Sequence, residues 1–105
     1  ILPGLNLLSD ALIRRTQAKH MSDSVFEAPD VFADNTKQAI GSGCLFSLVG
    51  AIEGICQRMQ NRMPAKPLRI ICGGDAARVH AQLRGDYRLD TSALMRGLSV
   101  IAERY

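Results

Sequence analysis

Two consecutive glycines at the end of a short apolar run are the residues in this sequence with most potential for chemistry. Residues 68–72 form a β-branched run typical of a strand, which stops at Gly73-Gly74, and a helical pattern follows from Ala76. Glycines at such a turn let the backbone approach a planar or anionic ligand, and the N-terminus of the next helix adds partial positive charge. Gly73 and Gly74 are therefore candidate nucleotide-binding residues, although an ordinary tight turn has the same composition.

A second candidate site is the run Asp34-Asn35-Thr36, which precedes the longest periodic apolar segment. All three residue types cap helices, because a side-chain oxygen can accept from the unpaired N–H groups of the first turn. Capping is the simpler interpretation. In the functional alternative, the Thr36 hydroxyl and the adjacent helix N–H groups donate to an oxygen of a ligand. Asn35 and Thr36 are therefore candidate substrate-binding residues.

The histidines and cysteines form no recognisable catalytic or metal-binding pattern. His20 and His80 have no Ser, Cys or carboxylate partner at a familiar spacing, so we interpret both as structural or surface residues. Cys44, Cys56 and Cys72 form neither a CxxC motif nor a Cys/His spacing. We therefore predict no metal site and no catalytic residue, and we expect reduced cysteines in a cytoplasmic protein.

Four helices and one clear strand must position these residues. A lone strand needs neighbours for its backbone donors and acceptors. We therefore expect the partner of the strand to lie outside this chain or in a second copy of it. The predicted elements are helices over about 5–19, 36–63, 76–83 and from 90 or 91 to the C-terminus, a loop over 21–34, a strand over 68–72 and a brief extended piece over 87–89.

The predicted helix over 36–63 is unusually rich in glycine. Gly41, Gly43, Gly50 and Gly54 each cost about 1 kcal/mol relative to alanine in a helix interior. Close packing against another backbone would explain such glycines, and so would a ligand or a partner subunit on that face. We favour close packing, of which a symmetric pair of these helices is one form.

The composition indicates one small globular domain. The chain has 105 residues, 47% of them hydrophobic, and a net charge of +3. Its cations are mostly interleaved with acids and do not form a stripe, so a nucleic-acid partner is not expected. The N-terminal stretch lacks the features of a signal peptide and no apolar stretch approaches about 18 residues, so a membrane partner is not expected either.

Four short motifs, in order, resemble the C-terminal portion of type III pantothenate kinases. The resemblance covers nearly the whole chain. The motifs are Ile1-Leu2-Pro3-Gly4-Leu5, Asn35-Thr36-x-x-Ala39-Ile40-x-Ser42-Gly43, Gly73-Gly74-x-Ala76 and Leu94-Met95-Arg96-Gly97-Leu98.

The resemblance implies an ATP-dependent kinase that phosphorylates pantothenate in the first step of coenzyme A synthesis. Such enzymes are homodimers of two ribonuclease-H-like halves, in the superfamily of actin, Hsp70 and sugar kinases, and they use Mg and a monovalent cation such as potassium. Residues 1–105 would be an incomplete C-terminal subdomain of this α/β fold, mostly helical with one or two short strands. Thr36, with Asn35, would contact pantothenate, Gly73 and Gly74 would lie near the adenosine of ATP, and the helix over 36–63 would form the dimer interface.

The chain departs from the family pattern in two respects. Cys72 stands where a threonine usually precedes the two glycines. The segments that carry the phosphate loop, the catalytic base and the cation site are absent, so the missing N-terminal half would be a required partner and the chain should not turn over alone. The alternative function is a dimerising regulatory module of the Bvg accessory factor type, a name that refers to transcriptional activation, although no DNA-reading helix is evident.

Overall fold

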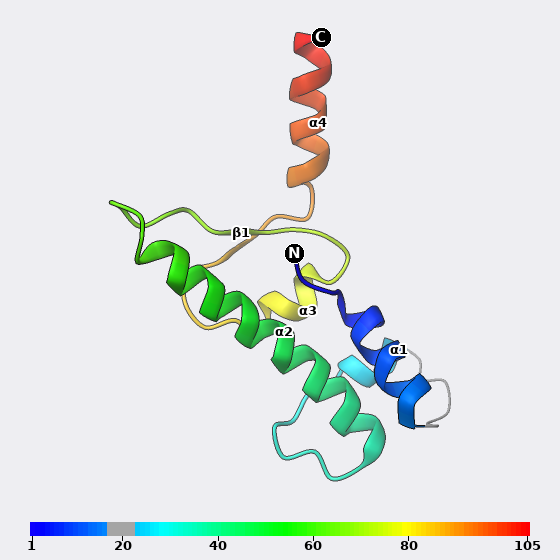
Figure 1. Cartoon of the computed structure of the whole chain (residues 1–105). Helices are drawn as coiled ribbons and strands as arrows, with labels where there is room; N and C mark the ends of the chain where they lie inside the picture. Colours follow the sequence, from blue (N-terminus) through cyan, green and yellow to red (C-terminus); the bar gives the residue numbers. More distant parts are fainter. Residues whose placement is uncertain (17–22) are drawn as a thin grey trace.

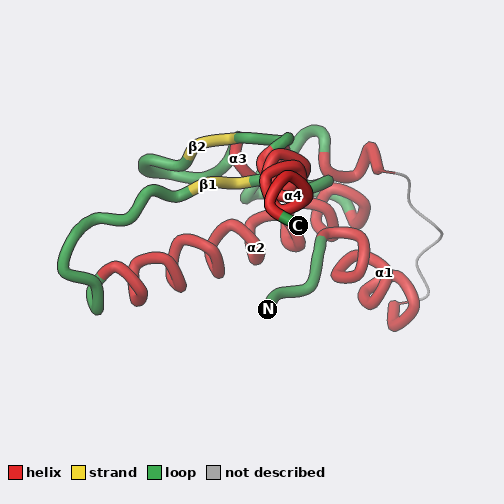
Figure 2. Tube along the Cα trace, turned by 90° about the horizontal axis from the view of Figure 1, so that it is seen from above, coloured by secondary structure: helices red, strands yellow, loops and turns green. Residues whose placement is uncertain are grey.

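A long central helix organises the molecule (Figure 1). The structure is a computed structural model, and it describes residues 1–16 and 23–105. Helix α1 and the short 3-10 helix η1 pack against the N-terminal part of the central helix α2, while α3 and two short strands lie over its middle (Figure 2). The elements are α1 (Leu5–Thr16), η1 (Asp23–Phe26), α2 (Thr36–Gln60), β1 (Ile70–Ile71), α3 (Ala76–His80), β2 (Arg88–Leu89) and α4 (Ala93–Arg104).

The core lies where α1, η1 and α3 meet α2. Helix α2 buries one face of its N-terminal half, because its apolar side chains recur at helical spacing there. Leu5 of α1 and Leu45 of α2 are the largest fully buried side chains. The core consists of Leu5, Val25, Phe26, Ile40, Cys44, Leu45, Val49 and Val79.

The glycines of α2 differ in their surroundings. A Cβ atom at Gly41 would overlap the backbone carbonyl of Val25, so η1 packs directly against the helix backbone at this point. Close packing is thereby confirmed as the reason for Gly41. Around Gly43 and Gly50 there is open space, with no atom within 4 Å of the position of a Cβ atom. Packing among the residues that the structure describes therefore does not explain these two glycines.

The strand β1 has a partner in this chain, which corrects the prediction made from the sequence. It pairs in parallel with β2, with Ile70 opposite Arg88 and Ile71 opposite Leu89. The N–H of Arg88 donates to the carbonyl of Arg69, and the N–H of Asp90 donates to that of Ile71, each at 2.9 Å. The brief extended piece near 87–89 is thus the second strand. Each strand of a two-stranded sheet still has one open edge.

His80 and Tyr87 hold this sheet against α3. The Nε2 atom of His80 lies 2.8 Å from the carbonyl oxygen of Tyr87, and the guanidinium of Arg69 covers the Tyr87 ring at 4.1 Å from its centroid. Tyr87 is buried. These contacts confirm the structural interpretation of His80.

Most predicted elements are present with shorter bounds. The helix expected over 36–63 ends at Gln60, the one over 76–83 ends at His80, and the strand expected over 68–72 is Ile70–Ile71. The loop expected over 21–34 contains η1. The predicted end of the first helix near residue 19, together with His20, lies outside the described residues. The chain is α/β and mostly helical, as expected.

Helix α4 extends away from the rest of the molecule. It is seen lengthwise in Figure 1 and end-on in Figure 2, and none of its residues is buried. The radius of gyration is 16.3 Å, whereas a compact chain of 100 residues has one of about 13 Å. The chain by itself is therefore more extended than a compact domain of its size.

One helix in the described part of the chain, α2, is long and apolar enough to cross a membrane by length and composition. The prediction that no apolar stretch approaches about 18 residues was therefore wrong, because α2 is apolar on average although Ser42, Ser47 and Glu53 lie within it. A third of its most apolar 18-residue window is buried inside the protein. The core helix of a soluble protein passes the same test, so this finding is weak evidence for a membrane.

Candidate functional site

The Gly73-Gly74 turn borders an open cavity of about 270 Å³. Gly73 has a φ of +110°, a conformation that side-chain-bearing residues rarely adopt, so the turn requires glycine there. A Cβ atom added at either glycine would have no atom within 4 Å, so the backbone of the turn faces free space. The cavity is lined by Leu48, Ile52, Ile71, Cys72, Gly73, Gly74, Asp75, Ala76 and Val79.

Several residues that line this cavity with the turn are apolar. Leu48 and Ile52 lie one helical turn apart on α2, and Ile71 of β1 joins them. A cavity lined by apolar side chains and by an open glycine backbone can accept a flat ring with polar edges. Cys72 is exposed at its rim.

Asp75 connects this turn to the start of α1. Although Asp75 is at the N-cap position of α3, its side chain does not cap that helix. Its Oδ2 atom instead accepts a hydrogen bond of 3.1 Å from the backbone N–H of Leu5. This long-range cap places the N-terminus of α1 beside the glycine turn, an arrangement that sequence spacing could not predict.

At the other candidate site, Asn35 acts as the N-cap of α2. Its Oδ1 atom accepts from the N–H of Gln38 at 2.9 Å, and its Nδ2 group donates to Asp34 at 3.1 Å. The capping interpretation of Asn35 is thus what the structure shows. Thr36 is the first helical residue and is exposed. A contact of either residue with a substrate remains a prediction.

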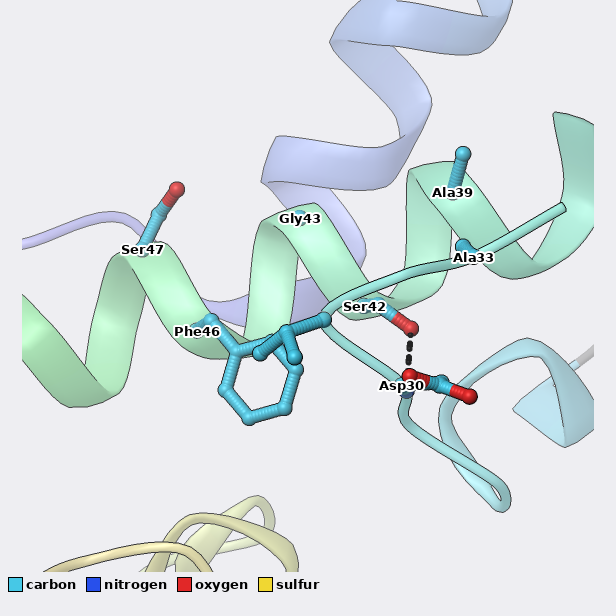
Figure 3. A pocket seen from close by; sticks show the side chains of 8 residues that line it. Asp30, Ala33, Ala39, Ser42, Gly43, Phe46 and Ser47 are labelled. Atoms are coloured by element: carbon cyan, nitrogen blue, oxygen red, sulfur yellow. Dashed lines mark hydrogen bonds between the residues drawn. The ribbon is translucent and has the colours of Figure 1, made fainter.

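A larger cavity, of about 530 Å³, lies between α2 and the loop that precedes it (Figure 3). The backbone N–H of Asp30 donates to the buried Ser42 hydroxyl at 2.9 Å, which holds the loop against the helix. Residue types alone did not reveal this cavity, because its lining comes from a loop and a helix whose contact is a tertiary feature. The lining residues are Asp30, Val31, Ala33, Ala39, Ser42, Gly43, Phe46 and Ser47.

The two sites predicted from the sequence lie at separate places along α2. Thr36 begins the helix, whereas Leu48 contacts the cavity of the glycine turn. Twelve helical residues span about 18 Å, so one small ligand group cannot contact both places. The arrangement suits two ligands, or two ends of a long one.

Comparison with known proteins identifies the family of this chain. The family model described as type III pantothenate kinase matches residues 1–58, which is more than half of the chain. The chain belongs to the type III pantothenate kinase family. The α/β character of the structure is consistent with that family.

Relatives named type III pantothenate kinase match nearly the full length of the chain. The one from Moorella thermoacetica is 30% identical over 104 residues, which is 99% of this chain and 41% of the relative. The one from Janthinobacterium sp. (strain Marseille) is 34% identical over 103 residues, which is 97% of this chain and 40% of the relative. The chain thus spans about two fifths of the length of these type III pantothenate kinases.

The ionisable groups of this family member do not assemble into a metal site in the part of the chain that the structure describes. Burial raises the pKa of the Cys44 thiol. Burial also raises the pKa of the Tyr87 phenol, and the neighbouring Cys56 thiol adds to that increase. Both groups are therefore held in their neutral forms, which suits a structural role.

Proposed function

We propose that this chain is the C-terminal portion of an ATP-dependent pantothenate kinase, which converts pantothenate to 4'-phosphopantothenate in coenzyme A synthesis. The observation that carries the proposal is the open Gly73-Gly74 turn facing the apolar residues Leu48 and Ile52, in a member of this family. Residues 1–105 would be an incomplete subdomain of a two-domain kinase with ribonuclease-H-like halves. The location would be cytoplasmic.

In this proposal the cavity at the glycine turn receives the adenosine of ATP. The adenine ring would lie against Leu48 and Ile52, and its polar edge would face the backbone of Gly73 and Gly74. A volume of about 270 Å³ is slightly below the usual range for small-molecule sites, which begins at about 300 Å³. The cavity therefore suits one moiety of the nucleotide, with the phosphates held elsewhere in the kinase.

Thr36 would contact pantothenate through its hydroxyl group. The exposed start of α2 also presents backbone N–H groups and the ammonium group of Lys37, which favour the carboxylate of pantothenate. Since the carbonyl oxygen of the Asn35 side chain already caps the helix, Asn35 would act mainly by holding Thr36 in place.

The remaining parts of the reaction would come from outside this chain. No three His, Cys, Asp or Glu side chains converge within residues 1–16 and 23–105. The proposal therefore assigns both cations, the phosphate loop and the catalytic base to the missing N-terminal half. Alone, the chain would bind ligand fragments without turnover.

A homodimer would form through α2. Gly43 and Gly50 are seven residues apart and thus lie on the same face, where no described residue outside the adjacent helix backbone comes within 4 Å of a Cβ position. Open glycines on a helix let a second backbone approach closely, which is the property that a symmetric helix pair needs. Phe46 lies between them in sequence and is only partly buried.

The proposal is tested by ligand binding and by reconstitution. Adenosine and pantothenate are titrated separately into the isotopically labelled chain, and backbone amide shifts are followed by NMR. We expect adenosine to shift Gly73 and Gly74 and pantothenate to shift Thr36, whereas Gly85, a turn glycine that lines neither cavity, serves as the control. The chain is then mixed with the part of the Janthinobacterium relative that it does not match, and ATP-dependent phosphorylation of pantothenate is assayed with Mg and potassium.

Phosphorylation by the mixture, with none by either part alone, would support the kinase proposal. The absence of both ligand shifts and of activity would contradict it. The regulatory-module alternative gains no support from the Moorella and Janthinobacterium relatives, both of which carry kinase names.

A further inference from the structure

The C-terminal helix α4 has one apolar face that none of the described residues covers. Leu94, Leu98 and Ile101 recur at spacings of four and three residues and are 68%, 51% and 56% exposed. This spacing places them on one side of the helix, with Met95 beside them. In a soluble domain such a stripe normally faces a core, so the face lacks its counterpart here.

The junction between β2 and α4 holds the helix in this extended position. The carboxylate of Asp90 accepts hydrogen bonds from the backbone N–H and hydroxyl of Ser92 and forms an ion pair with Arg96. These contacts tie the first turn of α4 to the end of the sheet. The helix direction is thus set by local contacts, and the helix stands away from the other elements of the chain (Figure 1).

The accessible surface of the chain indicates how large the missing counterpart is. The chain exposes 7845 Å², whereas a compact monomer of its mass exposes about 5,800 Å². The excess of about 2,000 Å² is more than twice the ~800 Å² that one partner buries in a standard interface. The excess belongs to the whole chain, α4 included, and a domain-sized occupant covers more of it than a single helix does.

We propose that the α4 face docks against the part of the type III pantothenate kinase that lies outside this chain. The inference rests on the proposed function, because it takes this chain to be part of a longer kinase. The match with the Moorella relative covers 99% of this chain, so α4 belongs to the sequence shared with that relative. The match covers only 41% of the relative, and the larger, unmatched part is an occupant of domain size.

Two other occupants fit the helix less well. A membrane-surface helix carries several basic residues on its polar face, but on α4 Glu103 adjoins Arg104 and the remaining basic residue, Arg96, is paired with Asp90. A second copy docked through α4 alone would contact a helix of 12 residues, about 18 Å long. Such a contact would cover only a small part of the excess surface.

The test compares this chain alone with the same chain fused behind the unmatched part of the Janthinobacterium relative. Amide hydrogen exchange is measured across α4 in both proteins. We expect exchange in α4 to be fast in the chain alone and slower by about tenfold or more in the fusion. Leu98→Asp should remove that protection, whereas Ser99→Asp, the same charge on the adjacent exposed residue, should preserve it.

Equally fast exchange in a cooperatively folded fusion would overturn the proposal. If the fusion does not fold, the two parts are mixed as separate chains and the same measurement is made on this chain, where unchanged exchange again overturns it. Protection that rises with the concentration of the chain alone would assign the face to a second copy, and protection by phosphatidylglycerol vesicles would assign it to a membrane. Protection without pantothenate phosphorylation would leave the docking intact and reject the kinase function.

Discussion

The Oδ2 atom of Asp75 accepts a hydrogen bond of 3.1 Å from the backbone N–H of Leu5, 70 positions earlier in the chain. The first N–H groups of a helix have no partner within the helix, and a carboxylate there also interacts favourably with the helix dipole. Leu5 is fully buried, so the bond fixes α1 where its first apolar side chain enters the core. The same aspartate follows Gly74, and the cap therefore couples the packing of α1 to the glycine turn.

Loss of this cap should destabilise the protein. Asp75→Ala leaves the N–H of Leu5 without its acceptor, and we expect the free energy of unfolding to fall by about 0.5–2 kcal/mol. Asp75→Asn keeps an acceptor oxygen and should lose less. Urea unfolding measures both values, and Asp10→Ala on the exposed side of α1 is the control. Equal stability of Asp75→Ala and the unmodified protein would show that the bond contributes nothing.

Replacing Gly41 or Gly50 of α2 by alanine should change the stability of the protein in opposite directions. Gly41→Ala places a methyl group against the carbonyl of Val25, and overpacking of this kind typically costs about 1–3 kcal/mol. Gly50→Ala meets open space and should stabilise the isolated chain by up to about 1 kcal/mol, through helix propensity. Thermal unfolding distinguishes the two variants, and a loss of stability in Gly50→Ala would contradict the open surroundings of that residue.

The proposed homodimer requires a small residue at position 50. A bulky side chain, as in Gly50→Leu, should prevent close approach of two α2 helices and weaken self-association measured by sedimentation. The similar helix propensities of leucine and alanine make Gly50→Ala a suitable control. A dimer of unchanged affinity in Gly50→Leu would place the interface elsewhere.

The start of α4 should loosen in acid. The ion pair with Arg96 lowers the pKa of Asp90, and the hydrogen bonds from Ser92 lower it further. Because the pKa is lower in the folded state, the stabilisation is present above the unfolded value of about 3.9 and is lost as the pH falls through the folded value. NMR shifts of the first turn of α4 should therefore change on acidification below about pH 4. Asp90→Asn should abolish that change, and Asp10→Asn should not.

The sheet should weaken in alkali through Tyr87. Burial raises its pKa above the ordinary value, so the folded state retains the phenolic proton longer than the unfolded state does. The stabilisation that the neutral phenol provides is fully present below about pH 10. It is lost as the pH rises toward the pKa of Tyr87 in the folded state. Above about pH 10 the unmodified protein should therefore lose stability relative to Tyr87→Phe. Tyr105→Phe, at a fully exposed position, should show no such shift.

Local chemistry in the sequence determined several features of this protein. The periodic apolar residues determined α2, and the oxygen of Asn35 determined where that helix begins, since a cap acts over only three residues. The turn at Gly73 was equally predictable, because a positive φ favours glycine. The motif resemblance correctly indicated the family from the same short segments.

Contacts between distant segments were decided only by the tertiary structure. β1 and β2 are two residues each, too short for their pairing to be read from periodicity, and their parallel register joins Ile70 to the distant Arg88. Likewise, Gly41 and Gly43 have the same intrinsic preference, yet only Gly41 meets the backbone of η1. Asp75 is a common capping residue type at the N-cap position of α3, but its side chain caps α1 instead. The partner of a side chain depends on which surfaces the folded core brings within hydrogen-bonding distance. That distance cannot be read from the separation of two residues in the sequence.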